Sequence, residues 1–223
     1  MSNYEIYYWA ARGVSYLIII PAIIGFVRFT KIDRGFIPFF FLVFLDLLTE
    51  INFEILSRTL GTNSISNNFY FLVSFYIILW QLIRWGFFEL KNWWMIFISI
   101  LMLTTWIVEN LIISSLLNFN SYCVVINAGF ILILSIQALS KISFLFKKEA
   151  TKKLIFLILS IWVLKYTQLI ITETSWIFLQ NLSFEFNVSL GILGMFVNAM
   201  TNLAYLLIAI WIPKKRKYSW FSP

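Results

Sequence analysis

Seven long apolar runs, separated by short polar connections, form the dominant pattern along this chain. A helix needs about 20 consecutive apolar residues to cross the hydrocarbon core of a bilayer. The runs that meet this length cover residues 13–30, 36–57, 68–88, 93–117, 122–146, 153–179 and 187–212. The pattern therefore predicts an all-α polytopic membrane protein, in which residues 1–223 form a single domain, a seven-transmembrane-helix bundle.

Composition supports this interpretation. The chain of 223 residues is 61% hydrophobic, and 12% of its residues are charged, about half the roughly 25% usual in soluble domains. The first apolar run lies close to the N-terminus, but it lacks the basic segment and the small-residue cleavage pattern of a secretory signal. We expect it to remain as a membrane span.

Lysine and arginine are distributed unevenly between alternate connections. The connections after the first, third and fifth runs and the C-terminal segment carry Arg28, Lys31, Arg34, Lys91, Lys147, Lys148, Lys152, Lys153, Lys214, Lys215, Arg216 and Lys217. The opposite side carries Arg12 and Arg58. Because cytoplasmic connections of membrane proteins are enriched in Lys and Arg, we expect a cytoplasmic C-terminus and an N-terminus outside.

The position of these cations also bears on partners. A formal net charge of +7 does not indicate nucleic acid here, because the cations gather on one predicted side of the membrane. Anionic lipid headgroups attract such residues by about 1 kcal/mol each. We expect membrane lipids as partners, with a partner membrane protein or a homo-oligomer as further candidates. The bias toward Asn, Ile, Lys and Phe is typical of an AT-rich bacterial genome and indicates the bacterial cytoplasmic (inner) membrane.

Several residues that support common chemistries are missing. The chain contains no histidine, which is the commonest metal ligand and the usual general base near neutral pH. Its one cysteine, Cys123, excludes an intramolecular disulfide and a thiolate metal cage. Glycine-rich phosphate loops, dinucleotide fingerprints and the G-x-S-x-G motif are also absent. We therefore expect no metal and no cofactor.

Carboxylates inside the second apolar run are the strongest functional signal. Asp46, Glu50 and Glu54 follow one another at steps of four residues, so on a helix their direction changes by only about 40° per step. A charge at the centre of a bilayer costs at least about 2.5–3.5 kcal/mol on insertion scales. Such residues normally face a bundle interior or a water-filled cavity, where they mark a functional path.

Other apolar runs contribute polar positions at similar depths. Lys165 falls near the middle of the sixth run, and polar residues of the seventh run lie on one helical face. The predicted ligand-binding or ion-binding residues are Asp46, Glu50, Lys165, Glu54, Glu109, Gln168, Glu173, Asn198 and Asn202. Of these, Asp46, Glu50 and Lys165 are the central candidates.

A purely structural role is the alternative for each of these residues. Amide side chains hydrogen-bond between membrane helices, typically for about 0.6 kcal/mol each. Lys165 can form an ion pair with Asp46 or Glu50, and Arg58 can pair with Glu54 one helical turn away. One lysine cannot neutralise all the acids, however, so the surplus must be protonated, hydrated or bound to a cation.

Three classes of function remain open from the sequence. The first is a transporter or receptor whose outward-facing polar cavity takes a proton, a cation or a small zwitterionic ligand. The second is a non-catalytic membrane subunit or scaffold of a larger membrane complex. The third is a histidine-independent lipid-handling enzyme that uses a carboxylate as general acid or base. Because no nucleophile is identifiable, a non-enzymatic role is favoured over an enzymatic one.

Overall fold

The computed structural model describes residues 3–89, 93–145, 149–178 and 183–213. These residues form helices joined by short connections. The helices are α1 (Asn3–Tyr16), α2 (Ile19–Arg28), α3 (Ile37–Thr59), α4 (Ser64–Arg84), α5 (Trp93–Ile107), α6 (Ser121–Leu145), α7 (Glu149–Phe178) and α8 (Phe184–Trp211), with 3-10 turns η1 (Phe29–Lys31) and η2 (Arg34–Phe36) before α3 and a π-helical turn η3 (Val108–Ile113) after α5.

Within the described residues, seven helical segments are long and apolar enough to cross a membrane, which confirms the predicted number of spans. They are Trp9–Lys31, Arg34–Thr59, Ser64–Arg84, Trp93–Ile113, Ser121–Leu145, Glu149–Phe178 and Glu185–Trp211. Two of them, the third and the fourth, end four residues earlier than predicted. The third ends at Arg84 because Gly86, at φ +79°, turns the chain in a left-handed conformation that glycine adopts readily. The fourth ends at Ile113, where Ser114 becomes extended.

The first span is a broken helix. Pro21 has no N–H to donate to the carbonyl of Leu17, and its ring crowds that position. Accordingly α1 ends at Tyr16 and α2 begins at Ile19. The break frees backbone carbonyls of this turn, and Asn202 of α8 donates its side-chain amide to the carbonyl of Val14 at 2.9 Å.

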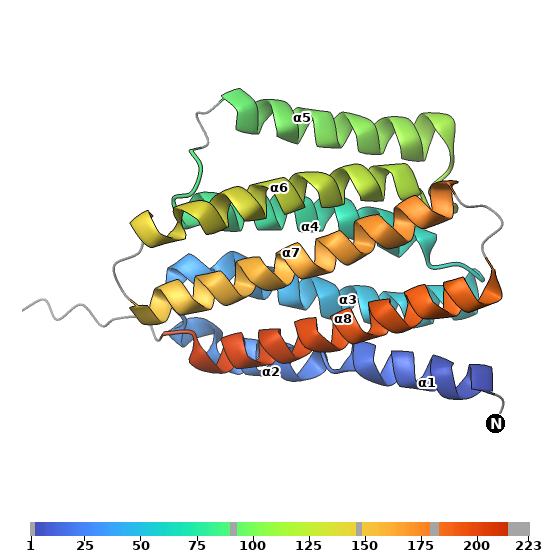
Figure 1. Ribbon diagram of the computed structural model, residues 1–223, viewed down its shortest axis with the longest axis horizontal. Coiled ribbons are helices and arrows are strands. Elements are labelled where there is room, and N and C mark those ends of the chain that lie inside the picture. Colours follow the sequence, from blue (N-terminus) through green and yellow to red (C-terminus); the bar gives the residue numbers. More distant parts are fainter. Residues whose placement is uncertain (1–2, 90–92, 146–148, 179–182, 214–223) are drawn as a thin grey trace, which may run out of the picture.

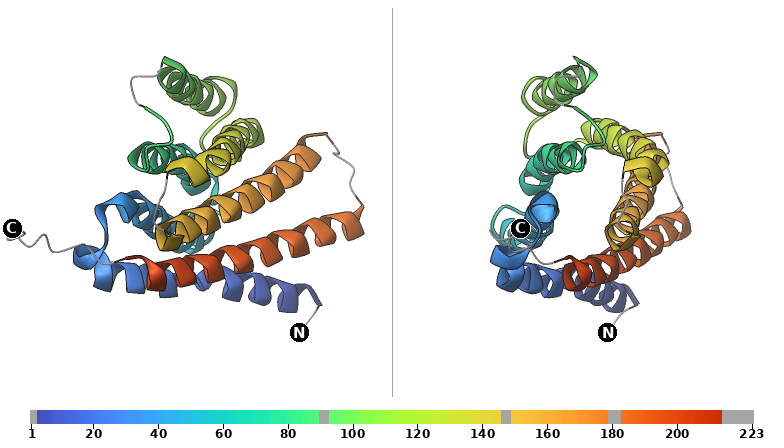
Figure 2. Two further views of the ribbon diagram at one scale, coloured as in Figure 1. Left: turned by 60° about the vertical axis from the view of Figure 1, so that its left-hand side comes forward. Right: turned by 90° about the vertical axis from the view of Figure 1, so that its left-hand side faces the viewer.

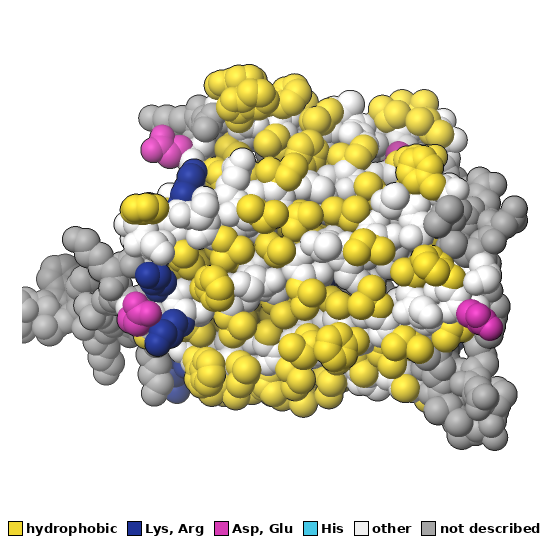
Figure 3. Space-filling view, viewed as in Figure 1, with side chains coloured by type: hydrophobic (Ala, Val, Ile, Leu, Met, Phe, Trp, Pro, Cys, Tyr) yellow, Lys and Arg dark blue, Asp and Glu magenta, His cyan; other side chains and the backbone are white. Residues whose placement is uncertain are grey.

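The helices run along a common direction and surround an interior, with α5 at the edge of the bundle beside α4 and α6 (Figures 1 and 2). At one end of the bundle, α2, α4, α6 and α8 finish and α3 and α7 begin. We call this the basic end, because described cations gather there: Arg28, Lys31, Arg34, Arg84, Lys141, Lys152 and Lys153. Figure 3 shows dark-blue side chains at this end and a broad apolar belt along the helices.

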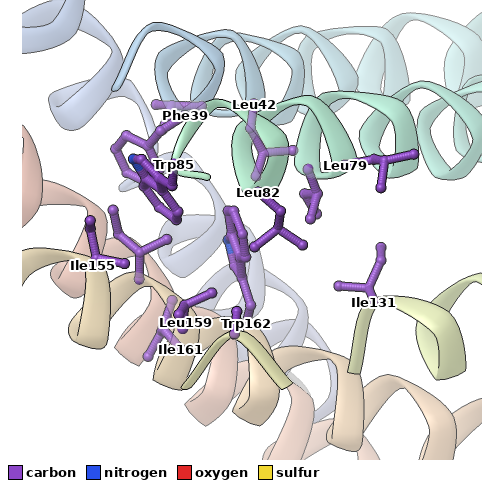
Figure 4. Packing of buried hydrophobic residues seen from close by; sticks show 14 of the residues in the cluster. Phe39, Leu42, Leu79, Leu82, Trp85, Ile131, Ile155, Leu159, Ile161 and Trp162 are labelled. Carbon is purple, nitrogen blue, oxygen red and sulfur yellow. The ribbon is translucent and has the colours of Figure 1, made fainter. Parts of the chain in front are cut away.

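The half of the bundle at the basic end is filled by large apolar side chains (Figure 4). The rings of Trp85 and Trp162 stack with their centroids 6.1 Å apart, and Phe39 meets Tyr205 edge to face at 5.1 Å. Gln81, a buried polar side chain in this half, has both its amide oxygen and its amide nitrogen in hydrogen bonds. It accepts the backbone N–H of Phe39 at 2.7 Å and donates to a carbonyl of η2, also at 2.7 Å. These bonds hold the start of α3 against the end of α4.

Candidate functional site

An interior cavity of ≈ 270 Å³ lies in the other half of the bundle. Its walls come from the α1–α2 junction and from α3, α4, α7 and α8, together with the connection before α6. The structure brings six of the nine predicted site residues to this cavity: Asp46, Glu50, Lys165, Gln168, Asn198 and Asn202. Helices far apart in the sequence therefore present polar side chains to one space.

Asp46 and Lys165 form an ion pair across the cavity. The Lys165 ammonium lies 3.7 Å from Oδ2 of Asp46 and donates to the hydroxyl of Tyr70 at 3.0 Å. The ammonium–carboxylate distance exceeds the roughly 2.7–2.9 Å of a charge-assisted hydrogen bond. The side chains of Asp46 and Lys165 stay 12% and 25% exposed. The pair is thus loose and accessible, although it lies deep in the bundle.

A second group of charges lies along α3, farther from the basic end than Asp46. The buried guanidinium of Arg12 lies 3.8 Å from Oε2 of Glu50 and 3.4 Å from Oε2 of Glu54. It also stacks over the ring of Phe53, with its central carbon 3.8 Å from the ring centroid. Arg58 donates its Nε hydrogen to Glu54 at 2.7 Å, as predicted for that pair.

Arg12 is a residue of this charged group that the sequence analysis did not include among the site candidates. It was assigned only to the outer interface, whereas α1 carries it into the bundle beside Glu50. Asp46, Glu50 and Glu54 are therefore matched by three cations, Lys165, Arg12 and Arg58. The expected surplus of negative charge is not present in this group of described residues.

Amides close the side of the cavity next to α1. Asn198 donates to the hydroxyl of Ser15 at 3.2 Å, and Asn202 to the carbonyl of Val14. Gln168 donates to Thr172 at 2.8 Å, one helical turn along α7. The first two bonds join α8 to α1 and correspond to the structural role that the sequence analysis considered for amides. The same three side chains also line the cavity.

Three of the nine predicted residues do not line this cavity, namely Glu54, Glu109 and Glu173. Glu109, in η3, accepts the backbone N–H groups of Tyr122, at 3.2 Å, and Cys123. These donors belong to the first turn of α6, where a carboxylate satisfies N–H groups that have no helical partner. Glu173 accepts the hydroxyl hydrogen of Ser121 at 2.7 Å. Both glutamates are buried at the start of α6, which they fasten to neighbouring segments.

The cavity does not continue to the basic end. Trp162, about one turn nearer the basic end than Lys165 on α7, and Tyr205, nearer that end than Asn202 on α8, are both completely buried. The indole N–H of Trp162 donates to the hydroxyl of Tyr205 at 3.2 Å. This layer joins the apolar core of the basic end. The polar cavity therefore lies on the side of this layer away from the basic end.

The donor set of the cavity suits binding rather than metal chemistry. Among the described residues, no group of three His, Cys, Asp or Glu side chains lies close enough to hold a metal ion. The cavity instead offers one ammonium, two carboxylates, amides and hydroxyls around a small volume. These groups can orient a small polar molecule through several hydrogen bonds at once.

Comparisons of the chain with protein-family models, with curated proteins and with solved structures give no match. Its function therefore has to be inferred from the chemistry of the cavity.

Proposed function

We propose that this protein is a membrane receptor that binds a small zwitterionic ligand in the cavity between α1, α3, α4, α7 and α8. The loose, accessible ion pair between Asp46 and Lys165 carries this proposal. A ligand carboxylate next to Lys165 and a ligand ammonium next to Asp46 and Glu50 would exchange one set of charge partners for another. No buried charge would lose its partner in that exchange.

Charge balance favours a zwitterion over the proton or cation that the sequence left open. The acids and bases of the cavity and of the adjoining Arg12 group are equal in number. A ligand with net charge would leave one charge uncompensated in a region of low dielectric, which costs several kcal/mol. A zwitterion adds no net charge.

Reception is favoured over transport because the half of the bundle between the cavity and the basic end is packed with buried apolar side chains. Transport is the second candidate, and one observation favours it. The broken helix α1–α2 lines the cavity with Ser15 and Ile18, and secondary transporters bind substrates at discontinuous helices of this kind. A transport cycle would require the core around Trp162 to open.

Binding of small zwitterions to the purified protein in lipid nanodiscs tests the proposal. Glycine betaine and free α-amino acids serve as probes, and choline and acetate serve as matched ions that carry one of the two charges. We expect saturable binding of a zwitterion, detected by calorimetry, and at least tenfold weaker binding in Asp46→Asn and Lys165→Met. Glu185→Gln, an exposed acid at the start of α8, is the control and should bind normally.

Two results would count against a zwitterion receptor. One is preference for choline or acetate over every zwitterion of the panel. The other is zwitterion binding that Asp46→Asn and Lys165→Met leave as strong as in Glu185→Gln.

We further propose that the N-terminus lies outside and the basic end faces the cytoplasm of a bacterium, so that the cavity opens outward. The cations of the basic end support this orientation through the positive-inside rule. The test uses single cysteines in a Cys123→Ala background, with Leu60→Cys between α3 and α4 and Lys31→Cys in η1. A membrane-impermeant maleimide should label Leu60→Cys in intact cells and Lys31→Cys only after lysis. The reverse pattern would invert the orientation.

A further inference from the structure

A second hollow lies at the basic end, between the start of α7 and the end of α8. It has a volume of ≈ 360 Å³ and is lined by Ala150, Lys153, Leu154, Leu157 and Trp211. It shares no residue with the cavity proposed for the zwitterion. Its lining is apolar except for Lys153, whose side chain is exposed.

The position of this groove relative to a bilayer follows from the two helices that form it. Both α7 and α8 are membrane-spanning segments, and the groove lies where α7 begins and α8 ends. Trp211 is 60% exposed, and tryptophan is enriched where membrane proteins cross the interface. Lys153 is thus at headgroup depth, and Leu157, one turn further along α7, faces the hydrocarbon region.

The size of the groove selects among occupants. A volume of ≈ 360 Å³ holds roughly twelve water-sized groups, which matches a segment of one acyl chain. A partner helix is about 10–12 Å across and would need a broad open face. The volume of the groove therefore fits a segment of a lipid chain better than a whole partner helix.

Charge complementarity specifies the headgroup. Lys152 and Lys153 lie side by side in the first turns of α7, near Glu149. Arg28, at the same end, already binds the end of α8, because its guanidinium donates to the carbonyls of Ile210 and Ile212 at 2.6 and 2.8 Å. Among the described residues, Lys153 is the cation that lines the groove itself.

We propose that this groove binds one anionic phospholipid, with its phosphate at Lys153 and an acyl chain against Leu154, Leu157 and Trp211. Such sites, basic at the rim and apolar below, hold acidic lipids between membrane helices. The lipid would fill a gap between α7 and α8 that the side chains of the described residues leave open. This site depends neither on the orientation of the chain nor on the zwitterion cavity.

The experiment compares phosphatidylglycerol with phosphatidylcholine of the same chains, added to the full-length protein in detergent micelles. Bound lipids are counted by native mass spectrometry. We expect wild-type protein to prefer phosphatidylglycerol and Lys153→Gln to lower that affinity about fivefold, with phosphatidylcholine unaffected. Lys31→Gln, an exposed lysine at the same end outside the groove, is the matched control and should retain the wild-type preference.

A second variant tests the acyl chain separately from the charge. Ala150→Phe fills the groove from an exposed position on α7 and leaves Lys153 in place, so it should weaken binding of phosphatidylglycerol. A thermal unfolding scan of each variant verifies that the fold is intact. The proposal is overturned by equal losses in Lys153→Gln and Lys31→Gln, by unchanged binding in Ala150→Phe, or by displacement of the lipid with inorganic phosphate.

Discussion

The two halves of the bundle fill the space between their helices in different ways. At the basic end, Phe39, Trp85 and Trp162 interlock with aliphatic side chains and the interior is closed. At the opposite end, Asp46 and Lys165 face an accessible cavity. Apolar side chains pack without needing hydrogen-bond partners, whereas charged groups within a bilayer need counter-charges or water. The polar half is therefore less densely packed than the apolar half, and it carries charged and polar groups that can form hydrogen bonds and ion pairs.

This comparison separates stability from binding. Dense packing of the apolar half limits the molecule to one arrangement, because interiors respond to the loss of even a few atoms. The charges of the polar half are matched among themselves, so they can exchange partners with a ligand at little cost. Substitutions in the first half should change stability, and substitutions in the second should change ligand binding as well.

The largest effect is expected where the packing is tightest. Trp162→Ala removes a ring that is completely buried and stacked on Trp85. Tryptophan-to-alanine changes in soluble cores cost about 3–5 kcal/mol, and we expect the lower part of this range, since lipid solvates the unfolded helices. The free energy of unfolding in a mixed-micelle denaturation series measures it. The control is Trp80→Ala, a 44% exposed tryptophan of α4; an equal loss there would contradict the assignment of a packed core.

Removal of the second cation tests the polar half. Arg12→Met leaves Glu50 without its guanidinium, and Glu54 with Arg58 alone. We expect a loss of about 1–3 kcal/mol, because an unpaired charge in a partly buried site costs more than the pair contributed. The double variant Arg12→Met/Glu50→Gln should recover part of the loss in a double-mutant cycle. Strictly additive losses would show that Arg12 and Glu50 do not interact.

Carboxylates that fasten α6 should affect stability alone. Glu109→Gln keeps one acceptor for the N–H groups of Tyr122 and Cys123 but removes the negative charge at a helix start. The expected loss is about 0.5–2 kcal/mol, as for other caps. Zwitterion binding, measured in the same preparation, should remain at the wild-type level. Weakened binding at full stability would place Glu109 in the functional site and remove the distinction between the two groups of acids.

The number of spans could be predicted from the sequence because bilayer thickness fixes a minimum length and the apolar signal adds up over each run. Ends of spans were harder to locate. Gly86 stops α4 through its own conformation, and the apolar residues that follow it gave no sign of this. Pro21 indicates from the sequence that the helix can break. Whether it breaks depends on whether the freed backbone carbonyls find hydrogen-bond donors such as Asn202.

The candidate site was predictable in part for a similar reason. Depth and helical spacing singled out Asp46, Glu50 and Lys165, and these three residues line one cavity. The depth of a residue in the membrane does not determine the direction in which its side chain points, however. Eight residues along a helix turn a side chain by about 80°, so Glu173 faces α6 while Lys165 faces the cavity. Arg12 precedes the predicted start of the first span, and a single-helix pattern could not place it beside Glu50.

The smallest effect is expected at the outer rim of the charged group, where the polar half meets solvent. Arg58 pairs with Glu54 one turn away, but its side chain is 77% exposed. Such pairs contribute about 0.2–1 kcal/mol, and salt screens them. Arg58→Ala should therefore lower the free energy of unfolding by less than about 1 kcal/mol, and the difference from wild type should shrink as salt rises. A loss as large as that of Arg12→Met, unchanged by salt, would show that Glu54 depends on Arg58 rather than on the buried Arg12, and would move the boundary of the polar half outward to the surface.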